Sequence, residues 1–228
     1  KEDLGMWVRI GKDDKITLIM PAAEMGQQAH TGQAMIVAEE MEADWNSIQV
    51  VHAPYNEEYI NPNSGDPRGV QQTGGSHSIE GFWLKLRQIG AGTREMLMES
   101  AAQKWGVPFS ECHARGGQVM HSESGRSLSY GQLAKAAAKL SPPENPTLKS
   151  PDQYRLLGKS IPKLHTQARV NGTAQYGIDV RRPGMLFAAV RQSQVFNGQV
   201  KSYNEKVAKS SKGVVAVVPI PNGVAVVA

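Results

Sequence analysis

The sequence predicts an α+β protein, and three observations support this fold class. Two β-branched runs at residues 7–10 and 15–19 flank a short turn, which is typical of a pair of strands. Apolar residues recur at helical spacing further along the chain, so we expect helices over residues 31–45 and 79–101. The last third of the chain contains mostly short strand patterns, so the whole is expected to mix both element types.

The first helix is expected to begin at Thr31, a suitable N-cap residue that follows a loop at residues 25–28. Its apolar stripe consists of Ala34, Met35, Ala38, Met41 and Trp45. Glu39, Glu40 and Glu42 fall outside this stripe and are expected to face solvent. The two strands therefore lead into a loop that lies at the start of a helix.

A strand at residues 48–53 and a long polar stretch at residues 55–72 follow the first helix. Loops as long as this polar stretch are usually functional or mobile. The stretch ends in a glycine-containing approach to the longest helix of the chain. That helix contains Gly90 and Gly92, which each cost roughly 1 kcal/mol inside a helix, so close contact with a neighbouring element is expected there.

The second half of the chain divides at a proline-rich stretch. A hairpin is expected over residues 111–128, followed by a short helix with Ser129 as N-cap and Gln132 in the capping-box position. We expect one domain over residues 1–140, a proline-rich linker over residues 141–157, and a second domain over residues 158–228. The second domain is expected to contain strands at residues 185–190, 199–203, 214–218 and 224–227, and a helix at residues 205–209.

Composition excludes several classes of protein. The chain has 228 residues, of which 40% are hydrophobic and 20% charged, which is typical of globular domains with real cores. The formal net charge of +4 is spread thinly, so no nucleic-acid partner is expected. No apolar run reaches the roughly 18 residues that a membrane-spanning helix needs. The single cysteine, Cys112, is expected to be buried, and it cannot ligate an iron–sulfur cluster alone.

Two glycine-containing loops are the candidate binding residues, because each leads into a predicted helix. The unpaired backbone N–H groups and the positive dipole end at a helix start favour phosphates and oxo-anions. The first loop contains Met25, Gly26, Gln27, Gln28 and Ala29; the second contains Thr73, Gly74, Gly75, Ser76, His77 and Ser78. From the residues alone, an alternative to ligand binding remains open, in which the two loops only pack against the rest of the fold.

Histidine spacing gives no metal site. The six histidines show no ligand pattern such as H-E-x-x-H, so no metal ion held by protein side chains is expected. Residues 121–124, His-Ser-Glu-Ser, contain the residue types of a hydrolase, but neighbours in a turn rarely face each other. No G-x-G-x-x-G or P-loop motif occurs, which argues against a nucleotide-binding oxidoreductase.

Two sets of motifs resemble a known family. Glu24-Met25-Gly26-Gln27 precedes a helix containing AEEMEADW, and a strand and a TGGS loop follow before the long helix. This order resembles the molybdopterin-binding subunit of the xanthine oxidase family, in particular the branch of isoquinoline 1-oxidoreductase beta subunits and membrane-bound aldehyde dehydrogenases. GKSIP at 158–162, ARVNGTAQYGIDV at 168–180, PGML at 183–186 and GVVAV at 213–217 resemble the α/β hammerhead domain of this family. The resemblance covers essentially the whole chain.

The resemblance implies a cofactor, a reaction and partners. The cofactor would be molybdopterin with molybdenum, in the cytosine dinucleotide form usual in bacteria, and the reaction would hydroxylate an aldehyde or an N-heterocycle as small-molecule substrate. Gln27 would hydrogen-bond an oxo ligand of the metal, and residues 73–78 would hold the pterin and its phosphates. Electrons would leave through a small [2Fe-2S] subunit to a cytochrome c or another acceptor, at the periplasmic side of the membrane.

The sequence departs from the family pattern in two ways. Gln28 stands where the family has a glycine, and the family's later pterin loop and its glutamate base do not occur in this chain. We therefore expect the chain to be an N-terminal part of a longer molybdenum subunit, with no catalytic residue of its own and no activity alone. A non-catalytic scaffold or binding module is the alternative.

Overall fold

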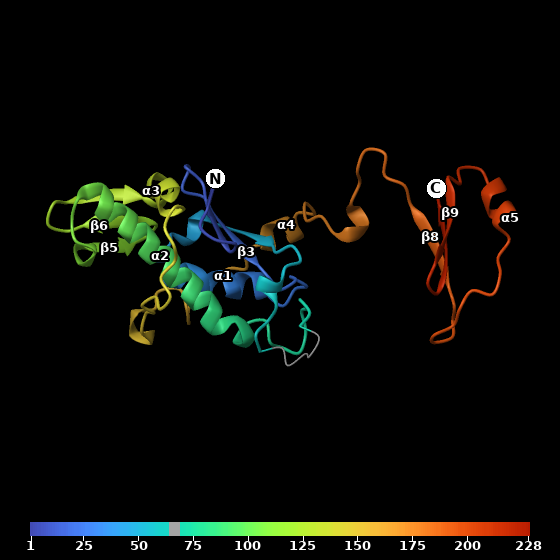
Figure 1. Ribbon diagram of the computed structural model, residues 1–228, viewed down its shortest axis with the longest axis horizontal. Coiled ribbons are helices and arrows are strands. Elements are labelled where there is room, and N and C mark those ends of the chain that lie inside the picture. The colour runs from blue at the N-terminus through green and yellow to red at the C-terminus, as the bar shows by residue number, and fades with distance from the viewer. Residues whose placement is uncertain (64–68) are drawn as a thin grey trace. The chain divides into compact units, whose positions relative to one another are not determined.

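The computed structural model describes residues 1–63 and 69–228 and confirms the α+β fold class (Figure 1). The described chain forms two compact units, Lys1–Gln167 and Ala168–Ala228. Part of the polar stretch predicted at 55–72, residues 64–68, lies outside the described residues.

A four-stranded sheet organises the first half of unit 1. Its strands are β1 (Glu2–Asp3), β2 (Val8–Ile10), β3 (Ile16–Met20) and β4 (Ile48–His52), in the order β1-β2-β3-β4. The first three strands pair antiparallel, whereas β3 and β4 are parallel and are joined by helix α1 (Ala29–Glu40). All five residues of β3 are buried, as its β-branched sequence requires in the centre of a covered sheet. The predicted strands at 7–10, 15–19 and 48–53 are confirmed to within a residue or two.

Helix α2 (Trp83–Trp105) follows a short 3₁₀ turn, η3 (Glu80–Phe82), and packs along α1. Gly90 lies at the closest approach of the two helices, where an added Cβ would sit 2.5 Å from the carbonyl oxygen of Val37. The close contact predicted from this glycine is confirmed, and it fixes how near the two helices can come. In Figure 1, α2 extends from the region of α1 to a second, smaller sheet.

The second sheet is an antiparallel meander of β5 (Cys112–Arg115), β6 (Gln118–His121) and β7 (Arg126–Ser129). Helix α3 (Tyr130–Ala137) follows directly, and the Ser129–Gln132 capping box forms as predicted. The buried hydroxyl of Tyr130 donates to the carbonyl oxygen of Met41 at the end of α1, which ties α3 to α1. Cys112 is buried, as expected.

The remaining 3₁₀ turns of the described chain are short. They are η1 (Trp45–Ser47), η2 (Glu57–Tyr59), η4 (Phe109–Glu111), η5 (Pro151–Gln153) and η6 (Gly177–Asp179). Within the same residues, no helix has the length and apolar composition needed to cross a membrane.

The start of α1 differs from the prediction. The helix begins at Ala29, with Gln28 as N-cap, and Thr31 lies buried inside the first turn. The hydroxyl of Thr31 accepts a hydrogen bond from the backbone N–H of Leu164 at 3.2 Å instead of capping its own helix. A tertiary contact therefore uses the residue that the local pattern assigned to the helix boundary.

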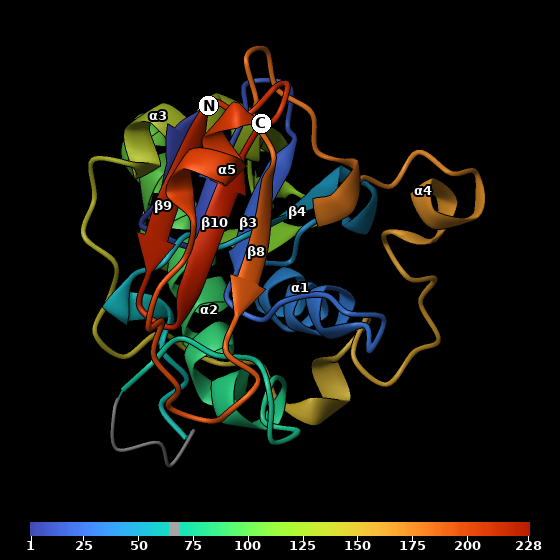
Figure 2. The same cartoon turned by 90° about the vertical axis from the view of Figure 1, so that its right-hand side faces the viewer.

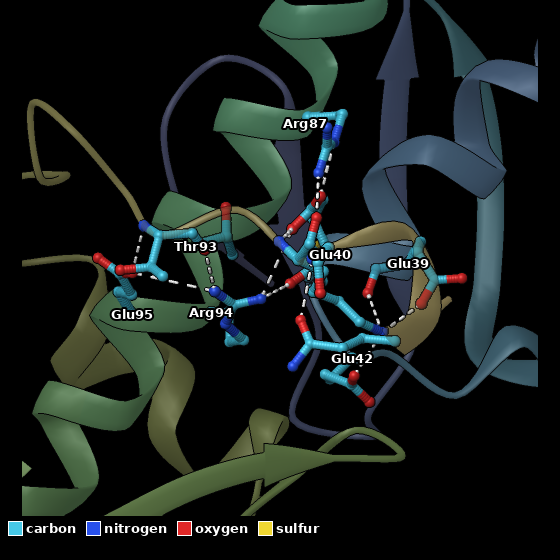
Figure 3. A network of polar contacts seen from close by, with 12 residues as sticks. Glu39, Glu40, Glu42, Arg87, Thr93, Arg94 and Glu95 are labelled. Atoms are coloured by element: carbon cyan, nitrogen blue, oxygen red, sulfur yellow. Dashed lines mark hydrogen bonds and ion pairs between the residues drawn. The ribbon is translucent and has the colours of Figure 1, made fainter. Parts of the chain in front are cut away.

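The solvent-facing position expected for Glu39 and Glu40 is wrong, because both residues are buried. Figure 3 shows Glu40 between two arginines of α2. The Nε atom of Arg87 lies 2.7 Å from Oε1 of Glu40, and Nη1 of Arg94 donates to its carbonyl oxygen at 2.7 Å. Buried carboxylates are tolerated when they are paired and hydrogen-bonded in this way.

The stretch 141–157, expected to be a linker, is instead part of unit 1. Its central residue Lys149 is buried and pairs through Nζ with the carboxylates of Glu39 and Glu42. One oxygen of Glu39 also accepts hydrogen bonds from the backbone N–H groups of Arg155, Leu156 and Leu157. The prolines keep this stretch extended, but charge pairing with α1 holds it against the core.

Unit 2 is a small α+β unit. Its antiparallel strands β8 (Ala188–Gln192), β10 (Gly223–Val227) and β9 (Ala216–Ile220) lie side by side in that order, with helix α5 (Glu205–Ser210) packed against β9 (Figure 2). Helix α4 (Thr166–Val170) spans the boundary between the units. The strand predicted at residues 199–203 does not form; these residues have no regular structure. The assignment of residues 158–228 to a hammerhead domain stays a prediction.

Candidate functional site

The two predicted loops lie side by side, although about fifty residues separate them in the sequence. The backbone N–H of Ala23 donates to the hydroxyl of Thr73 at 2.8 Å, so the chain entering the first loop is bound to the start of the second. On the far side, Nε2 of Gln33 in α1 donates to the carbonyl oxygen of Ser78 at 2.7 Å. The two ends of the second loop are therefore bound to the residues on either side of the first loop.

Glu24 occupies the anion position at the start of α1. Its carboxylate accepts hydrogen bonds from the backbone N–H groups of Gly26 at 2.9 Å, Gln28 at 3.2 Å and His30 at 3.2 Å. These are the donors that the sequence interpretation offered to a phosphate. An anion at this helix start would have to displace Glu24. The sequence prediction did not include Glu24 among the candidate binding residues, although a carboxylate just before a helix is a usual capping signal.

Gln28 adopts a left-handed backbone conformation, with φ 68° and ψ 24°. A glycine adopts this conformation without strain, whereas other residues lose roughly 1–2 kcal/mol there. The position at which the sequence departs from the family's glycine is therefore a position where the fold favours glycine.

Gln27 is held by its own loop. Its Nε2 donates to the carbonyl oxygen of Ala23 at 2.7 Å, and its Oε1 accepts from the backbone N–H of Met25 at 2.7 Å. A side-chain amide nitrogen carries two hydrogens, so one N–H remains when Ala23 is bound. Gln27 is exposed and fixed in direction, which suits a side chain that donates to a bound group. Met25 is 70% exposed.

The second loop contains several hydrogen-bond donors. Among the described residues, no protein group accepts from the backbone N–H groups of Gly74, Gly75 and Ser76, or from the hydroxyls of Ser76 and Ser78. A Cβ added to Gly74 would meet nothing within 4 Å. Gly75 has φ +61°, a conformation that favours glycine. The open space at Gly74 and the donors around it fit an oxygen-rich ligand.

Three hydrogen bonds stabilise the second loop. The backbone N–H of His77 donates to the carbonyl oxygen of Gly74 at 3.3 Å, and Nδ2 of Asn61 donates to the carbonyl oxygen of His77 at 3.0 Å. The imidazole Nδ1 of His77 lies 3.1 Å from a carboxylate oxygen of Glu80. His77 thus also holds the loop itself, and its expected contact with the cofactor stays a prediction.

An open cavity of about 1000 Å³ adjoins the second loop. Ser76 lies at its border, and its apolar wall includes Ile79, Trp83 and Leu84, with Lys85 and Glu80 as charged groups. A largely apolar, open cavity next to a donor-rich loop suits a flat ring system with polar edges.

A third segment, residues 163–165, contacts the first loop and the first turn of α1. Nζ of Lys163 donates to the carbonyl oxygen of Gly26 at 3.1 Å, which places a positive charge beside the loop. His165 lies with Nε2 3.3 Å from Nδ1 of His30. Burial lowers the pKa of His30 below its usual value, so this histidine is neutral at pH 7. Its Nε2 is buried and has no hydrogen-bond partner in the described part of the chain.

The hydrogen-bond donors of the two loops can be compared with the acceptor atoms of molybdopterin, which are found on its phosphate and on the edge of its pterin ring. The second loop fits, because it has backbone and hydroxyl donors beside open space. In the first loop, Gln27 retains a donor, whereas the backbone N–H groups of Gly26 and Gln28 are already used by Glu24. The candidate site therefore consists of residues 73–78 with the side chain of Gln27 and the charge of Lys163.

Comparison with known proteins gives the family. Residues 1–182 match the molybdopterin cofactor-binding domain family. The chain is 32% identical to the beta subunit of isoquinoline 1-oxidoreductase of Brevundimonas diminuta, over 97% of this chain and 32% of that protein. It is 34% identical to a membrane-bound aldehyde dehydrogenase [pyrroloquinoline-quinone] of Gluconacetobacter polyoxogenes, over 92% of this chain and 27% of that protein.

More distant similarities extend the comparison. A subunit of the nicotinate dehydrogenase of Pseudomonas putida is 26% identical, over the whole of this chain and 19% of that protein. The crystal structure of quinoline 2-oxidoreductase from Pseudomonas putida 86 aligns with 60% of this chain and 17% of its own, at 16% identity and a TM-score of 0.42, which is too low to establish a common fold. The chain spans about a third or less of the length of its three relatives.

The family match covers well over half of the chain and includes both loops of the candidate site. Two relatives above 30% identity cover more than nine tenths of it. The chain therefore belongs to the molybdopterin cofactor-binding domain family, in the molybdenum-binding subunits of the xanthine oxidase type.

Proposed function

We propose that this chain supplies part of the molybdopterin shell of a molybdenum-dependent oxidoreductase that oxidises an aldehyde or an N-heterocycle with oxygen from water. The observation that carries the proposal is that the bonds from Ala23 to Thr73 and from Gln33 to Ser78 hold the second loop against the segments on either side of the first loop. The names of two relatives, an isoquinoline oxidoreductase and an aldehyde dehydrogenase, support the substrate class.

The residues of this chain would bind and orient the cofactor. When bound, molybdopterin supplies a molybdenum centre that accepts two electrons from the substrate. The backbone N–H groups of Gly74 to Ser76 and the hydroxyls of Ser76 and Ser78 would hold acceptor atoms of the cofactor, and Gln27 would donate its second amide N–H toward the metal's ligands. Lys163 adds a positive charge that favours an anionic group.

Further features of the whole protein belong to the same proposal. We expect the cytosine dinucleotide form of the cofactor, a small [2Fe-2S] subunit that removes electrons, and a cytochrome c or another final acceptor. Cys112 is buried, and burial raises the pKa of its thiol, so it is unsuited to ligate a cluster. We also propose a periplasmic location and a catalytic glutamate base contributed by residues outside this chain.

One relative's name points to a different cofactor, pyrroloquinoline quinone. The match of residues 1–182 to a molybdopterin-binding family favours molybdopterin, because that match covers the candidate loops themselves. The two cofactors differ in metal content and can be separated by analysis.

The test uses the native gene product that contains this chain, purified from its source. Elemental analysis should give about one molybdenum per polypeptide, and denaturation should release a pterin with a cytosine nucleotide. A protein that contains the quinone and no molybdenum would contradict the proposal. A protein that contains neither, and that folds normally, would favour the scaffold alternative.

A further inference from the structure

A second group of potential ligands lies on the sheet of β5, β6 and β7, apart from the two loops. It consists of Glu111 at the end of η4, His121 at the end of β6, and Glu123 in the turn before β7. One ligand atom from each residue lies within 4.8 Å of the other two. We propose that these three side chains bind a divalent transition-metal cation, with Zn²⁺ as the best match.

The imidazole of His121 is placed in the manner of a metal ligand. Its side chain is 5% exposed, and its Nδ1 lies 2.7 Å from the hydroxyl oxygen of Ser124. Its Nε2 faces the carboxylate of Glu111 at 2.8 Å. Histidine ligands are generally oriented by a hydrogen bond at the nitrogen opposite the metal, and Ser124 can provide that bond. The neighbouring ring of Trp105, with its centroid 6.3 Å away, limits rotation of the imidazole.

Strand register explains how these residues meet. Cys112 pairs with His121 across β5 and β6, so Glu111, which precedes Cys112, arrives beside the histidine. The turn after His121 then returns Glu123 to the same end of the sheet. Spacing along the sequence does not predict this group. A pattern such as H-E-x-x-H describes two histidine ligands on one helix, whereas these ligands are brought together by an antiparallel hairpin.

The charged side chains in and around this group favour the binding of a cation. Glu111 and Glu123 bring two carboxylates to this group, and Arg126 is a basic residue close to it. Its Nε donates to the hydroxyl of Ser124 at 2.6 Å, and its guanidinium stacks over Trp105, 5.5 Å from the ring centroid. Arg126 thus braces the residue behind the histidine and does not itself pair with either carboxylate in the described contacts.

The donor set suits Zn²⁺. Zinc accepts imidazole nitrogen and carboxylate oxygen at about 2.0–2.2 Å, often with three protein ligands and a water molecule. Tetrahedral geometry then requires donor separations of about 3.3 Å. The Glu111–His121 pair at 2.8 Å must open slightly, and Glu123 must move inward, which its exposed position permits. A cation would replace the direct hydrogen bond between His121 and Glu111.

The experiment measures Zn²⁺ binding to the native gene product after chelator treatment, by titration calorimetry and elemental analysis. We expect one bound Zn²⁺ per chain that is lost in His121→Gln and weakened at least about tenfold in Glu123→Gln. The matched controls are His113→Gln, a neighbouring histidine outside the group, and Glu144→Gln, an exposed carboxylate of the 141–157 stretch; both should bind Zn²⁺ like the parent.

The variant Glu123→Gln keeps the test decisive if His121→Gln fails to fold, because Glu123 is exposed. Co²⁺ substitution adds a spectroscopic check, since a tetrahedral site with one nitrogen and two carboxylates gives visible absorption, which should need at least about tenfold more Co²⁺ to appear in Glu123→Gln. If the parent binds no stoichiometric Zn²⁺, or if Glu123→Gln and Glu144→Gln bind it equally, the group is an ordinary histidine–carboxylate hydrogen bond. This outcome does not depend on molybdenum, so it leaves the proposed function untouched.

Discussion

Gln33 in the interior of α1 donates its side-chain N–H to the carbonyl oxygen of Ser78 at 2.7 Å. The amide is fully buried, and its Oε1 has no partner within the described residues. Within the described residues, the hydrogen bond to Ser78 is therefore the one that this side chain makes. That bond fixes the second loop to the helix that follows the first, so the relative position of both loops depends on it.

Replacement of Gln33 by leucine should loosen the second loop. The substitution leaves the carbonyl oxygen of Ser78 unpaired, which we expect to lower the free energy of unfolding by about 1 kcal/mol. Hydrogen exchange of the amides of residues 74–78 should accelerate, while exchange in β3 stays unchanged. Unaltered exchange in residues 74–78 of a folded Gln33→Leu protein would show that the two loops are held together by other contacts.

The charge on Glu39 should contribute to the stability of unit 1. Breaking a buried ion pair by removing one partner typically costs about 3–5 kcal/mol, so Glu39→Gln should lower the free energy of unfolding by about 3 kcal/mol at pH 7. The exposed Glu144→Gln is the matched control and should change it by less than about 0.5 kcal/mol. Denaturant unfolding measures both values, and equal effects would mean that the pairing with Lys149 is energetically neutral.

The same carboxylate gives a dependence on pH. Burial raises the pKa of Glu39, but the hydrogen bonds from Lys149 and from the backbone N–H groups of residues 155–157 outweigh it, and the pKa lies below its usual value. A lowered pKa in the folded state contributes stability that is present above the unfolded pKa of about 4.3 and is lost as pH falls through the folded pKa. The parent should therefore lose its stability advantage over Glu39→Gln below about pH 4.3, and a constant difference down to acid pH would contradict this.

Glycine at position 28 should stabilise the protein. Gln28 adopts φ 68°, and glycine accepts this conformation without strain, although it has more freedom to lose on folding. The two effects together should raise the free energy of unfolding by about 0.5–1 kcal/mol in Gln28→Gly. A thermal melt beside the parent measures this change. A lower melting temperature would mean that the side chain of Gln28 makes up for its backbone strain.

The side chain of Gln27 should matter for turnover in the complete enzyme. Gln27→Ala removes the donor that we propose is directed at the cofactor, and by comparison with the loss of one oxyanion donor the rate should fall on the order of 10²-fold. Gln27→Glu should be at least as harmful, because a carboxylate can accept from Met25 but cannot donate to Ala23 or to an oxo group. Turnover is measured per bound molybdenum. Rates within a factor of about three of the parent, at full occupancy, would remove Gln27 from the site.

Local patterns predicted the elements whose causes are local. The strands at Val8–Ile10, Ile16–Met20 and Ile48–His52, the capping box at Ser129 and the close contact at Gly90 all follow from residue type and spacing. The solvent-facing position of Glu39 and Glu40 was wrong because polar residues opposite an apolar stripe normally face water. Here a distant stretch brings Lys149 to them, and α2 brings Arg87 and Arg94.

The candidate site was only partly predictable. The two glycine-containing loops were identified from their place before helices and from the family resemblance. Their contact could not be predicted, because it depends on the bonds of Thr73 and Ser78 to residues far away in the sequence. The role of Glu24 as a cap that uses the donors of the first loop was missed, although its position just before α1 was a signal.

The most direct test of the account is the cofactor content of Gly74→Leu in the native gene product. Neither Gly74 nor Gly177 has a left-handed backbone, and a Cβ added at either position would meet no protein atom within 4 Å. Both Gly74→Leu and the control Gly177→Leu should therefore fold with melting temperatures close to that of the parent. We expect Gly177→Leu to keep its full molybdenum and pterin content and Gly74→Leu to lose most of it, because the leucine fills the space beside the second loop. A folded Gly74→Leu protein with full molybdenum content would contradict the account.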